Sequence, residues 1–315
     1  MSDFKNMPVL VTGAEGFIGS HLCSRLVREG ARVAALVLPG ADLSRLALIE
    51  DKISINPLDI REIDQLEKFM VAFKPRRIFH LAAVTDVGRV WGSVDLVTEV
   101  NLGGTINLLR ALSLVDYEIL ITTCTAEAYG RNPAPFSEEM PLDPISPYSF
   151  SKAAASSFCR MAAASLGASV RILRLFLVYG PGQGEEHFLP QLIQAALTGR
   201  PFQMTAGEQT REYTFIDDVI EGFLLATKKA PGRGEVFNLG SGREISLKEM
   251  VEKVEEITGK KVNLDSQVLP YRENEIRRFF GNHNRSFERL GWRVKTSLDI
   301  GLVRTVGWYQ DHLVC

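Results

Sequence analysis

Two residues near the middle of the chain have the types and the spacing needed for proton transfer. Tyr148 and Lys152 stand four positions apart, so on a helix they share one face. An ammonium beside a phenol favours the phenolate, so a tyrosine with an ordinary pKa of about 10 can act as a base near neutral pH. Such a base can take the proton of an alcohol while hydride leaves the same carbon. A YxxxK pair alone is common by chance on a solvated helix face, but Pro147 marks a helix start here.

A second group of reactive side chains follows the strand expected at residues 118–123. Thr125 and Glu127 stand in the segment TTCTAEAYG. A hydroxyl at this place can bond both the phenol and a substrate oxygen, and a carboxylate can act as a base. The alternative for Thr125 is a hydroxyl that caps the following helix.

The glycines of the N-terminal segment VLVTGAEGFIG predict a phosphate-binding turn. Gly13, Gly16 and Gly19 follow the first strand and open a helix. Gly13 allows the turn, Gly16 lets the backbone approach a pyrophosphate, and Gly19 lets the helix pack closely on the strand. The helix start then offers free N–H groups to the phosphates. The alternative is a glycine-rich turn without a ligand.

The elements that must position these residues alternate between strand and helix, which predicts an α/β fold with a Rossmann-type doubly wound parallel sheet. A smaller C-terminal α/β lobe follows. We expect strands at 8–12, 32–38, 53–56, 77–81, 118–123, 169–176 and 236–239, and helices at 17–29, 62–73, 93–114, 148–166, 189–198, 214–228 and 246–258. The dinucleotide-binding domain is expected to contain residues 1–176 with segments near 212–242, and the substrate lobe residues 177–211 and 243–315.

Bulk properties exclude several classes of partner. The 315 residues carry a net charge of −2, so no basic field attracts nucleic acid or an anionic membrane. No apolar run reaches the roughly 18–20 residues of a spanning helix, and the N-terminus lacks the layout of a signal peptide. The four cysteines are scattered and indicate no zinc or other metal site. We therefore expect a cytoplasmic protein with reduced thiols.

The end of the second strand bears on the choice between NAD and NADP. NAD sites place a carboxylate there to bind ribose hydroxyls, but residues 36–40 read LVLPG. The Asp42 or Arg45 side chain can turn toward this strand end. The missing carboxylate slightly favours NADP over NAD. Asp59, after the third strand, is expected either to accept a hydrogen bond from the adenine amino group or to cap a helix.

Taken together, these segments resemble the extended short-chain dehydrogenase/reductase family, in particular its nucleoside-diphosphate-sugar epimerases and dehydratases. The resemblance covers nearly the whole chain. It rests on TGAEGFIGSHL at 12–22, HLAA at 80–83, VNLGGTINLL at 100–109, CTAEAYG at 124–130, PYSFSK at 147–152, LRLFLVYGPGQ at 173–183, REYTFIDDV at 211–219, VFNLGSG at 236–242 and LGW at 290–292.

The resemblance implies a role for each candidate residue. Tyr148 is the base, Lys152 lowers its pKa, and Thr125 is the hydroxyl member of the triad, with Asn101 near the lysine relay. Arg211, Arg272 and Glu275 are implied to hold the diphosphate and ribose of the substrate, and Arg89 and Thr125 to contact the sugar nucleotide. The expected cofactor contacts are Gly13, Gly16, Phe17, Ile18, Gly19, Asp59, Ile60, Leu81, Ala82, Ala83, Asn101, Tyr148 and Lys152.

The implied reaction begins with hydride transfer from carbon 4 of a nucleoside-diphosphate sugar. A 4-epimerase returns the hydride to the other face, whereas a 4,6-dehydratase also needs an acid where this chain has Ala126, a methyl group that donates no proton. Glu127 supplies the dehydratase base, and Leu177 replaces a frequent asparagine. We place epimerisation ahead of dehydration, and an NADPH-dependent 4-keto reductase third. The intact Tyr148–Lys152 pair disfavours a non-catalytic dinucleotide sensor.

The composition of two helices predicts a homodimer. Helices 102–115 and 148–166 are rich in small and apolar residues, and the equivalent helices of similar proteins form a four-helix interface. Small side chains allow close helix approach, although packing against the protein's own sheet is the alternative. The small residues concerned are Ala153, Ala154, Ala155, Ala162 and Ala163.

Overall fold

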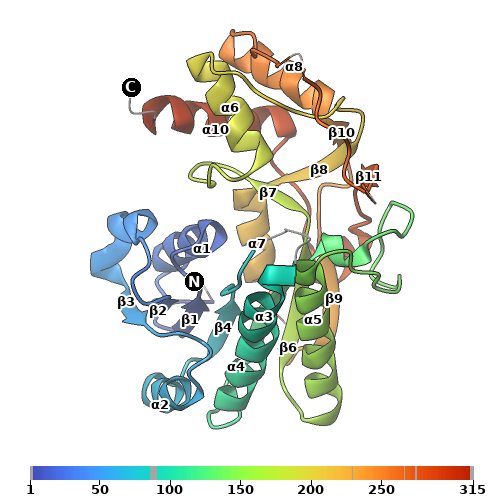
Figure 1. The fold of residues 1–315 in the computed structure, drawn as a ribbon. Coiled ribbons are helices and arrows are strands. Elements are labelled where there is room, and N and C mark those ends of the chain that lie inside the picture. Colours follow the sequence, from blue (N-terminus) through green and yellow to red (C-terminus); the bar gives the residue numbers. More distant parts are fainter. Residues whose placement is uncertain (1–2, 86–90, 229, 266, 274, 313–315) are drawn as a thin grey trace.

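The computed structural model describes residues 3–85, 91–228, 230–265, 267–273 and 275–312, and its largest element is a parallel β-sheet (Figure 1). The strand order is β3-β2-β1-β4-β5-β6-β9, and each described pairing is parallel. The order reverses between β1 and β4, which is where a dinucleotide-binding crevice opens in such sheets. The strands are β1 (Pro8–Thr12), β2 (Arg32–Val37), β3 (Ser54–Pro57), β4 (Arg77–His80), β5 (Ile119–Thr125), β6 (Val170–Leu175) and β9 (Arg233–Leu239). The predicted doubly wound α/β architecture is confirmed.

Helices cover both faces of this sheet because its side chains alternate between two apolar layers. In β1, Val9 and Val11 lie in one buried cluster and Leu10 in the other. The first cluster includes residues of α1 (Phe17–Arg28) and α7 (Ile216–Ala226); the second includes residues of α2 (Ile63–Phe73), α4 (Gly104–Leu112) and α5 (Pro147–Ser165). Each such buried aliphatic side chain stabilises the fold by roughly 1.5–3 kcal/mol.

The segment expected as one helix over 93–114 is interrupted in the structure. A 3-10 turn at Trp91–Ser93 leads into α3 (Val94–Val97), and a π-helical turn at Thr98–Gly103 separates α3 from α4. Such turns insert a residue into the helical ladder and are frequent at functional sites. This one contains Asn101, so the interruption sets where that side chain points.

A second, smaller sheet lies between the large sheet and the uppermost helices in Figure 1. In it β8 (Thr210–Phe215) pairs with β10 (Glu244–Ser246), β11 (Arg278–Phe279) and β7 (Leu177–Tyr179). The helices α6 (Phe188–Thr198), α8 (Leu247–Thr258) and α10 (Leu298–His312) pack on one another beside it, whereas α9 (Asn284–Leu290) contacts β9 and α7.

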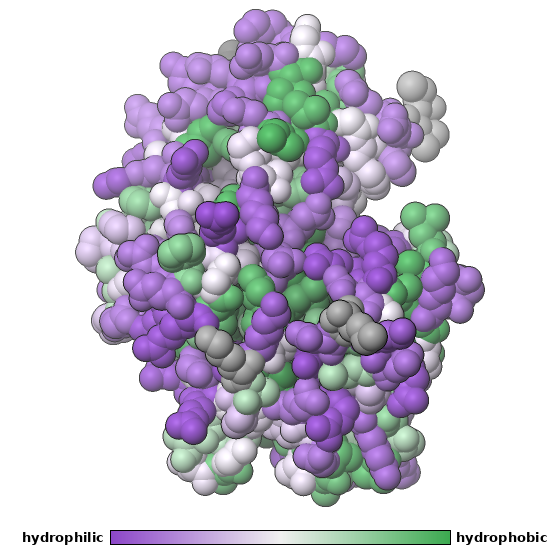
Figure 2. All heavy atoms as spheres, turned by 180° about the vertical axis from the view of Figure 1, so that it is seen from behind, coloured by the Kyte–Doolittle hydropathy of each residue, from purple (hydrophilic) through white to green (hydrophobic). Residues whose placement is uncertain are grey.

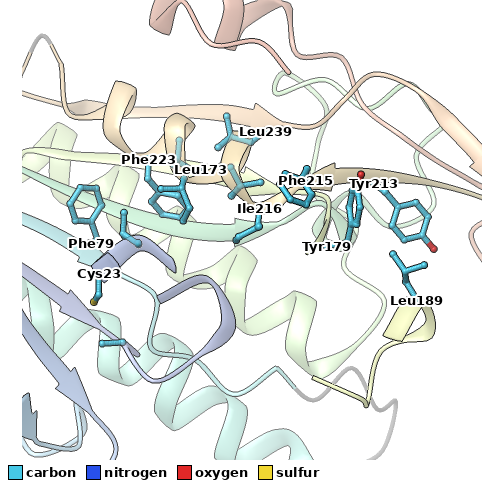
Figure 3. Close-up of a cluster of buried hydrophobic side chains, with 14 of the residues drawn as sticks. Cys23, Phe79, Leu173, Tyr179, Leu189, Tyr213, Phe215, Ile216, Phe223 and Leu239 are labelled. Carbon is cyan, nitrogen blue, oxygen red and sulfur yellow. The ribbon is translucent and has the colours of Figure 1, made fainter. Parts of the chain in front are cut away.

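One apolar cluster joins the two sheets. Figure 3 shows it running from Phe79 on β4 past Phe223 on α7 to Tyr179 and Phe215 of the smaller sheet. The rings of Phe79 and Phe223 lie 6.2 Å apart between centroids, and those of Tyr179 and Phe215 5.5 Å apart. Because this cluster is continuous and buried, the lobes share a hydrophobic core.

The face opposite the view of Figure 1 is mostly hydrophilic. Figure 2 shows hydrophobic side chains gathered there in small separate groups. Within the described residues, no helix is both long and apolar enough to cross a bilayer. Cys23, Cys124 and Cys159 are buried free thiols.

Two elements differ from the expected division into lobes, which otherwise stays a prediction. The segment 214–228 was expected to be a helix of the large domain, but Thr214 and Phe215 end strand β8 and the helix begins at Ile216. Helix α9 lies within the range expected for the substrate lobe, yet it packs on β9 of the large sheet. In both cases pairing and packing with distant segments decide the placement.

Candidate active site

At two of its glycines, the turn after β1 leaves no room for a side chain. Gly13 has a φ of +66°, and a Cβ added there would stand 2.7 Å from the backbone nitrogen of Ala82. A Cβ on Gly19 would stand 2.1 Å from the carbonyl oxygen of Gly13. Helix α1 begins at Phe17 without a side-chain cap, so the N–H groups of its first turn, which includes Ile18, are available to an anion. The turn therefore has the bare backbone that a pyrophosphate requires.

A buried chain of polar side chains links this turn to the next strand. The Thr12 hydroxyl accepts hydrogen bonds from the backbone of Leu81 and Ala82, both at 3.2 Å, and lies 2.8 Å from Nδ1 of His80. Nε2 of His80 lies 3.0 Å from the Thr105 hydroxyl, and burial lowers the pKa of His80 to about 3. A neutral imidazole therefore holds the segment 81–83 against the turn. Thr12 and His80 were not among the residues predicted from the sequence, although both stand at strand ends.

Asn101 connects that chain to the helix that carries the tyrosine. Its amide nitrogen donates to the Ser151 hydroxyl at 2.9 Å and to the Val84 carbonyl at 3.0 Å, and its amide oxygen accepts from Val84 N–H at 2.8 Å. Ser151 in turn donates to the Tyr148 carbonyl at 2.8 Å. Within the described contacts Asn101 thus fixes the backbone around Tyr148 through Ser151, rather than touching Lys152.

Tyr148 and Lys152 pair with two threonines of strand β5. The Lys152 ammonium donates to the Thr123 hydroxyl at 3.2 Å, and the Thr125 hydroxyl lies close enough to the Tyr148 phenol to lower its pKa. Two residues along a strand span about 6.6 Å and four residues along a helix span about 6 Å, so both pairs can form together. Since β5 and α5 run in opposite directions, Thr125 meets the earlier helix residue and Thr123 the later one.

The start of α5 is fixed by its own cap. The Ser146 hydroxyl accepts from Ser149 N–H at 3.0 Å, and the Ser149 hydroxyl accepts from Ser146 N–H at 3.0 Å, which is a reciprocal capping box. Pro147 occupies the first turn, where its missing N–H costs nothing. The cap fixes Tyr148 in the first turn of α5, at the mouth of the helix.

Burial opposes the pKa shift that the sequence predicts. Desolvation raises the pKa of Tyr148 above its ordinary value, and Thr125 opposes this only in part. Desolvation likewise lowers the pKa of Lys152. Burial therefore outweighs the lowering of the phenol's pKa that the neighbouring lysine was expected to bring, because both groups lose their hydration.

Thr125 and Glu127 both take part in the start of the short 3-10 helix Ala126–Tyr129. The Thr125 hydroxyl accepts from Glu127 N–H at 3.2 Å, so it caps this helix as well as contacting the phenol. The Glu127 carboxylate accepts from the Ser146 hydroxyl at 3.2 Å, which brings it to the mouth of α5. Ala126 between them is buried, and its methyl group supplies no proton.

The candidates near the ends of β2 and β3 have local partners. Asp42 accepts from the backbone and hydroxyl of Ser44, at 2.9 and 2.8 Å, and the Arg45 side chain donates to the Gly182 carbonyl at 3.1 Å. Asp59 forms a two-pronged ion pair with Arg61, whose hydrogen bonds lower the pKa of the Asp59 carboxyl. Helix α2 follows with Glu62, not Asp59, at its N-cap position, so the capping alternative is wrong. Ile60 is buried and packs beside Gly104.

Two of the three expected clamp residues meet in the smaller lobe. Arg211 forms an ion pair with Glu275 and also donates to the carbonyls of Thr210 and Ile276, at 2.8 and 2.9 Å. Arg272 lies in the same loop as Glu275 and is exposed. Glu275 also lines a cavity of about 360 Å³ between residues 130–134 and 275–278. Arg89 lies outside the described residues. Leu177, at the start of β7, is 38% exposed.

Comparison with known proteins gives the family. The model of the NAD-dependent epimerase/dehydratase family matches residues 9–240. The chain belongs to this family. It is 34% identical over 97% of its length to a UDP-glucose 4-epimerase of Mycolicibacterium smegmatis, of which it covers 99%. Its structure is similar to that of a UDP-glucose 4-epimerase of Thermotoga maritima, solved with UDP-glucose, with a TM-score of 0.91, 30% identity and coverage of 98% of this chain and 100% of that one.

A dehydratase is also among the similar structures. A dTDP-glucose 4,6-dehydratase from Streptomyces venezuelae, solved with NAD bound, has a TM-score of 0.88 and 28% identity, with 97% of this chain and 98% of that one covered. The resemblance to extended short-chain dehydrogenases is therefore confirmed, and the chain is an enzyme of that type. The slight preference predicted for NADP is not supported, since the cofactor bound in the Streptomyces venezuelae structure is NAD.

Proposed function

We propose that the protein is a nucleoside-diphosphate-sugar 4-epimerase. The observation that carries the proposal is the pairing of Tyr148 with Thr125 at the carboxyl end of β5, next to a buried Ala126. The pairing provides a proton acceptor for a sugar hydroxyl. The alanine leaves the site without the acid that a dehydratase uses. The similarity to two UDP-glucose 4-epimerases supports the same choice.

The chain's own residues account for the proton movements. When bound at the glycine turn, the nicotinamide dinucleotide supplies a hydride acceptor and donor. Tyr148 takes the proton from the oxygen on carbon 4 as hydride leaves that carbon, and Thr125 hydrogen-bonds the phenolic oxygen. After the keto sugar has turned over, Tyr148 would give the proton back to the same oxygen as carbon 4 is reduced from its opposite face. Each substrate is thus oxidised and reduced once, and no external reductant is consumed.

Lys152 and Asn101 have positioning roles in this scheme. Lys152 is buried, and its ammonium is held by Thr123 on the same strand face as Thr125. A positive charge held there stabilises a negative phenolic oxygen one helical turn away. Asn101 holds the first turn of α5 through Ser151, which keeps the phenol aimed at the crevice.

The Arg211–Glu275 pair is suited to hold the nucleotide part of the substrate. A guanidinium binds phosphate oxygens in a bidentate manner, and a carboxylate accepts from ribose hydroxyls. Binding would exchange the internal ion pair for these contacts, with Arg272 of the same exposed loop adding a second cation. We infer that the cavity beside Glu275 belongs to this nucleotide site.

The test is incubation of the purified protein with UDP-, GDP-, dTDP- and CDP-sugars, followed by separation and mass measurement of the products. An isomer of unchanged mass supports epimerisation. Loss of water indicates dehydration, and turnover only with NADPH and a 4-keto sugar indicates reduction. Either of the last two outcomes contradicts the proposal.

Two variants locate the chemistry. Tyr148→Phe should lower turnover by roughly 10²–10⁴-fold, the usual contribution of a positioned acid–base group, while the dinucleotide still binds. Glu127→Gln separates the mechanisms, because a 4-epimerase should keep most of its turnover and a 4,6-dehydratase should lose it. Near-normal turnover of Tyr148→Phe would show that another group is the base.

We also propose a cytoplasmic homodimer that uses the outer face of α5. Phe150 and Met161 on this helix are 56% and 42% exposed, and Leu96 on α3 is 46% exposed. The expected alanines contribute less, because Ala153 and Ala162 are buried in the apolar layer beside the protein's own sheet and Ala155 is buried as well. Sedimentation should give a dimer for the protein and a monomer for Phe150→Asp. A monomeric parent at micromolar concentration contradicts the proposal.

A further inference from the structure

The structure places a carboxylate where the sequence of β2 has none. Glu15 stands in the glycine turn after β1, and its Oε1 accepts a hydrogen bond of 3.0 Å from the backbone N–H of Leu38. Leu38 is the residue directly after β2. This hydrogen bond holds the Glu15 side chain, which belongs to the loop after β1, at the carboxyl end of β2.

The second oxygen of this carboxylate has no partner. Glu15 Oε2 is shielded from solvent and makes no hydrogen bond in the described structure. A buried carboxylate oxygen left without a donor is costly, so such an oxygen is rare unless a ligand completes it. Oε1 fixes the carboxylate in place and Oε2 remains open to a donor that the protein itself does not supply.

The other candidate groups at this edge are engaged elsewhere. Asp42 is held by Ser44, and the Arg45 side chain is turned to the Gly182 carbonyl. Residues 38–44 include no lysine or arginine. The only described carboxylate in contact with the residue that follows β2 is therefore that of Glu15, and no cation of that loop opposes it.

We propose that Glu15 binds the hydroxyl groups of the adenosine ribose and selects NAD over NADP. This inference rests on the proposed function, since it presumes a bound dinucleotide, and it deepens that proposal by naming the residue that sets the preference between NAD and NADP. In dinucleotide-binding folds the ribose hydroxyls meet a carboxylate at the end of the second strand. Glu15 supplies this group from the glycine turn, with Oε2 as the acceptor.

The same geometry excludes a 2′-phosphate. NADP would place a phosphate of nearly two negative charges against a carboxylate that Leu38 holds in position, and like charges at contact repel. NAD offers a hydroxyl donor at that place and completes the unpartnered oxygen. The absence of a β2 carboxylate therefore does not indicate NADP in this chain.

The test is calorimetric titration with NAD⁺ and with NADP⁺ of protein freed from any bound dinucleotide. The parent should bind NAD⁺ at least about tenfold more tightly than NADP⁺, as expected for a hydrogen bond to a charged group. In Glu15→Gln the side chain keeps its size and can still accept from Leu38, but it loses its charge. The ratio of the two affinities should fall by about tenfold or more.

Asp42→Asn is the matched control, because it removes a negative charge from the same edge and should leave the ratio unchanged. Thermal unfolding of both variants checks that a lost turn does not account for the result. A parent that prefers NADP⁺, or a Glu15→Gln variant that keeps the parental ratio, overturns the inference and leaves sugar epimerisation untouched. A parent that binds neither dinucleotide overturns both the inference and the proposed function.

Discussion

The double role of the Thr125 hydroxyl makes Thr125→Val an informative perturbation. This hydroxyl caps the 3-10 helix by accepting from Glu127 N–H, and it lies beside the Tyr148 phenol, whose pKa it lowers. Loss of a cap costs about 1 kcal/mol, and loss of a buried hydrogen bond about 1 kcal/mol more, while valine keeps the volume. With an unfolding entropy of about 2.1 cal/mol/K per residue, a destabilisation of ~2 kcal/mol lowers the Tm of a chain of this length by only ~3 °C.

The effect of Thr125→Val on catalysis should be much larger than its effect on stability. A hydrogen bond to a charged phenolate is worth roughly 1.5–3 kcal/mol, so turnover should fall by roughly 10- to 150-fold. Thr125 lowers the pKa of Tyr148, so its removal should also move the ascending limb of the pH–rate profile, on which Tyr148 loses its proton, to higher pH.

The assay is the rate of nucleotide-sugar isomerisation across pH, with thermal unfolding and dinucleotide titration on the same samples. Thr125→Ser keeps a hydroxyl and should recover most of the activity. Two results together would refute a role of Thr125 in the ionisation of Tyr148. Turnover of Thr125→Val would be within twofold of the parent, and the pH at which its rate rises would be unchanged.

Three further predictions concern the turn, a buried acid and the clamp. Gly19→Ala should abolish dinucleotide binding in a titration, because its Cβ would collide with the Gly13 carbonyl at 2.1 Å. Burial raises the pKa of the Glu212 carboxyl from 4.5 to about 7. The folded protein then keeps a proton that the unfolded chain loses, so the free energy of unfolding should fall by about 3 kcal/mol between pH 4.5 and 7 and change little above it. Urea unfolding at pH 5 and pH 8 measures this, and a steeper fall above pH 7 contradicts it. Arg211→Ala should raise the KM for the nucleotide sugar at least tenfold with a smaller change in kcat, and an unchanged KM would remove Arg211 from the clamp.

The large sheet could be predicted from the sequence because its signals are local. The apolar runs of β1 and β5 and the period of α1 and α5 each lie within one element, and the observed bounds differ from the expected ones by few residues. The π-helical turn at Asn101 could not be predicted this way. Its helical pattern is continuous, and the packing of Gly104 against Ile60 is a contact between distant segments.

The smaller sheet was missed for a related reason. β7, β10 and β11 have only three, three and two residues, too few to show alternation, and β8 was partly assigned to the following helix. Their pairing depends on segments as far apart as residues 177 and 278.

The candidate site shows the same limit. Tyr148, Lys152 and Thr125 were found by type and spacing, whereas the place of Glu15 at the end of β2 depends on how the turn packs. The pKa shift of Tyr148 was predicted downward, whereas its burial raises the pKa, because the sequence gives the neighbouring charge but not the burial.

Strand β9 reaches the large sheet only after the chain has passed through β7, α6, β8 and α7. A fragment ending at Phe176 would therefore leave the edge of β6 unpaired and would lack α7, which covers one apolar layer of the sheet. An exposed edge strand of this kind can pair with another chain, so the fragment would tend to aggregate. A chimera that exchanges the substrate-binding part with that of a relative must keep residues 216–239 with the N-terminal portion. The natural unit of recombination in this protein is discontinuous.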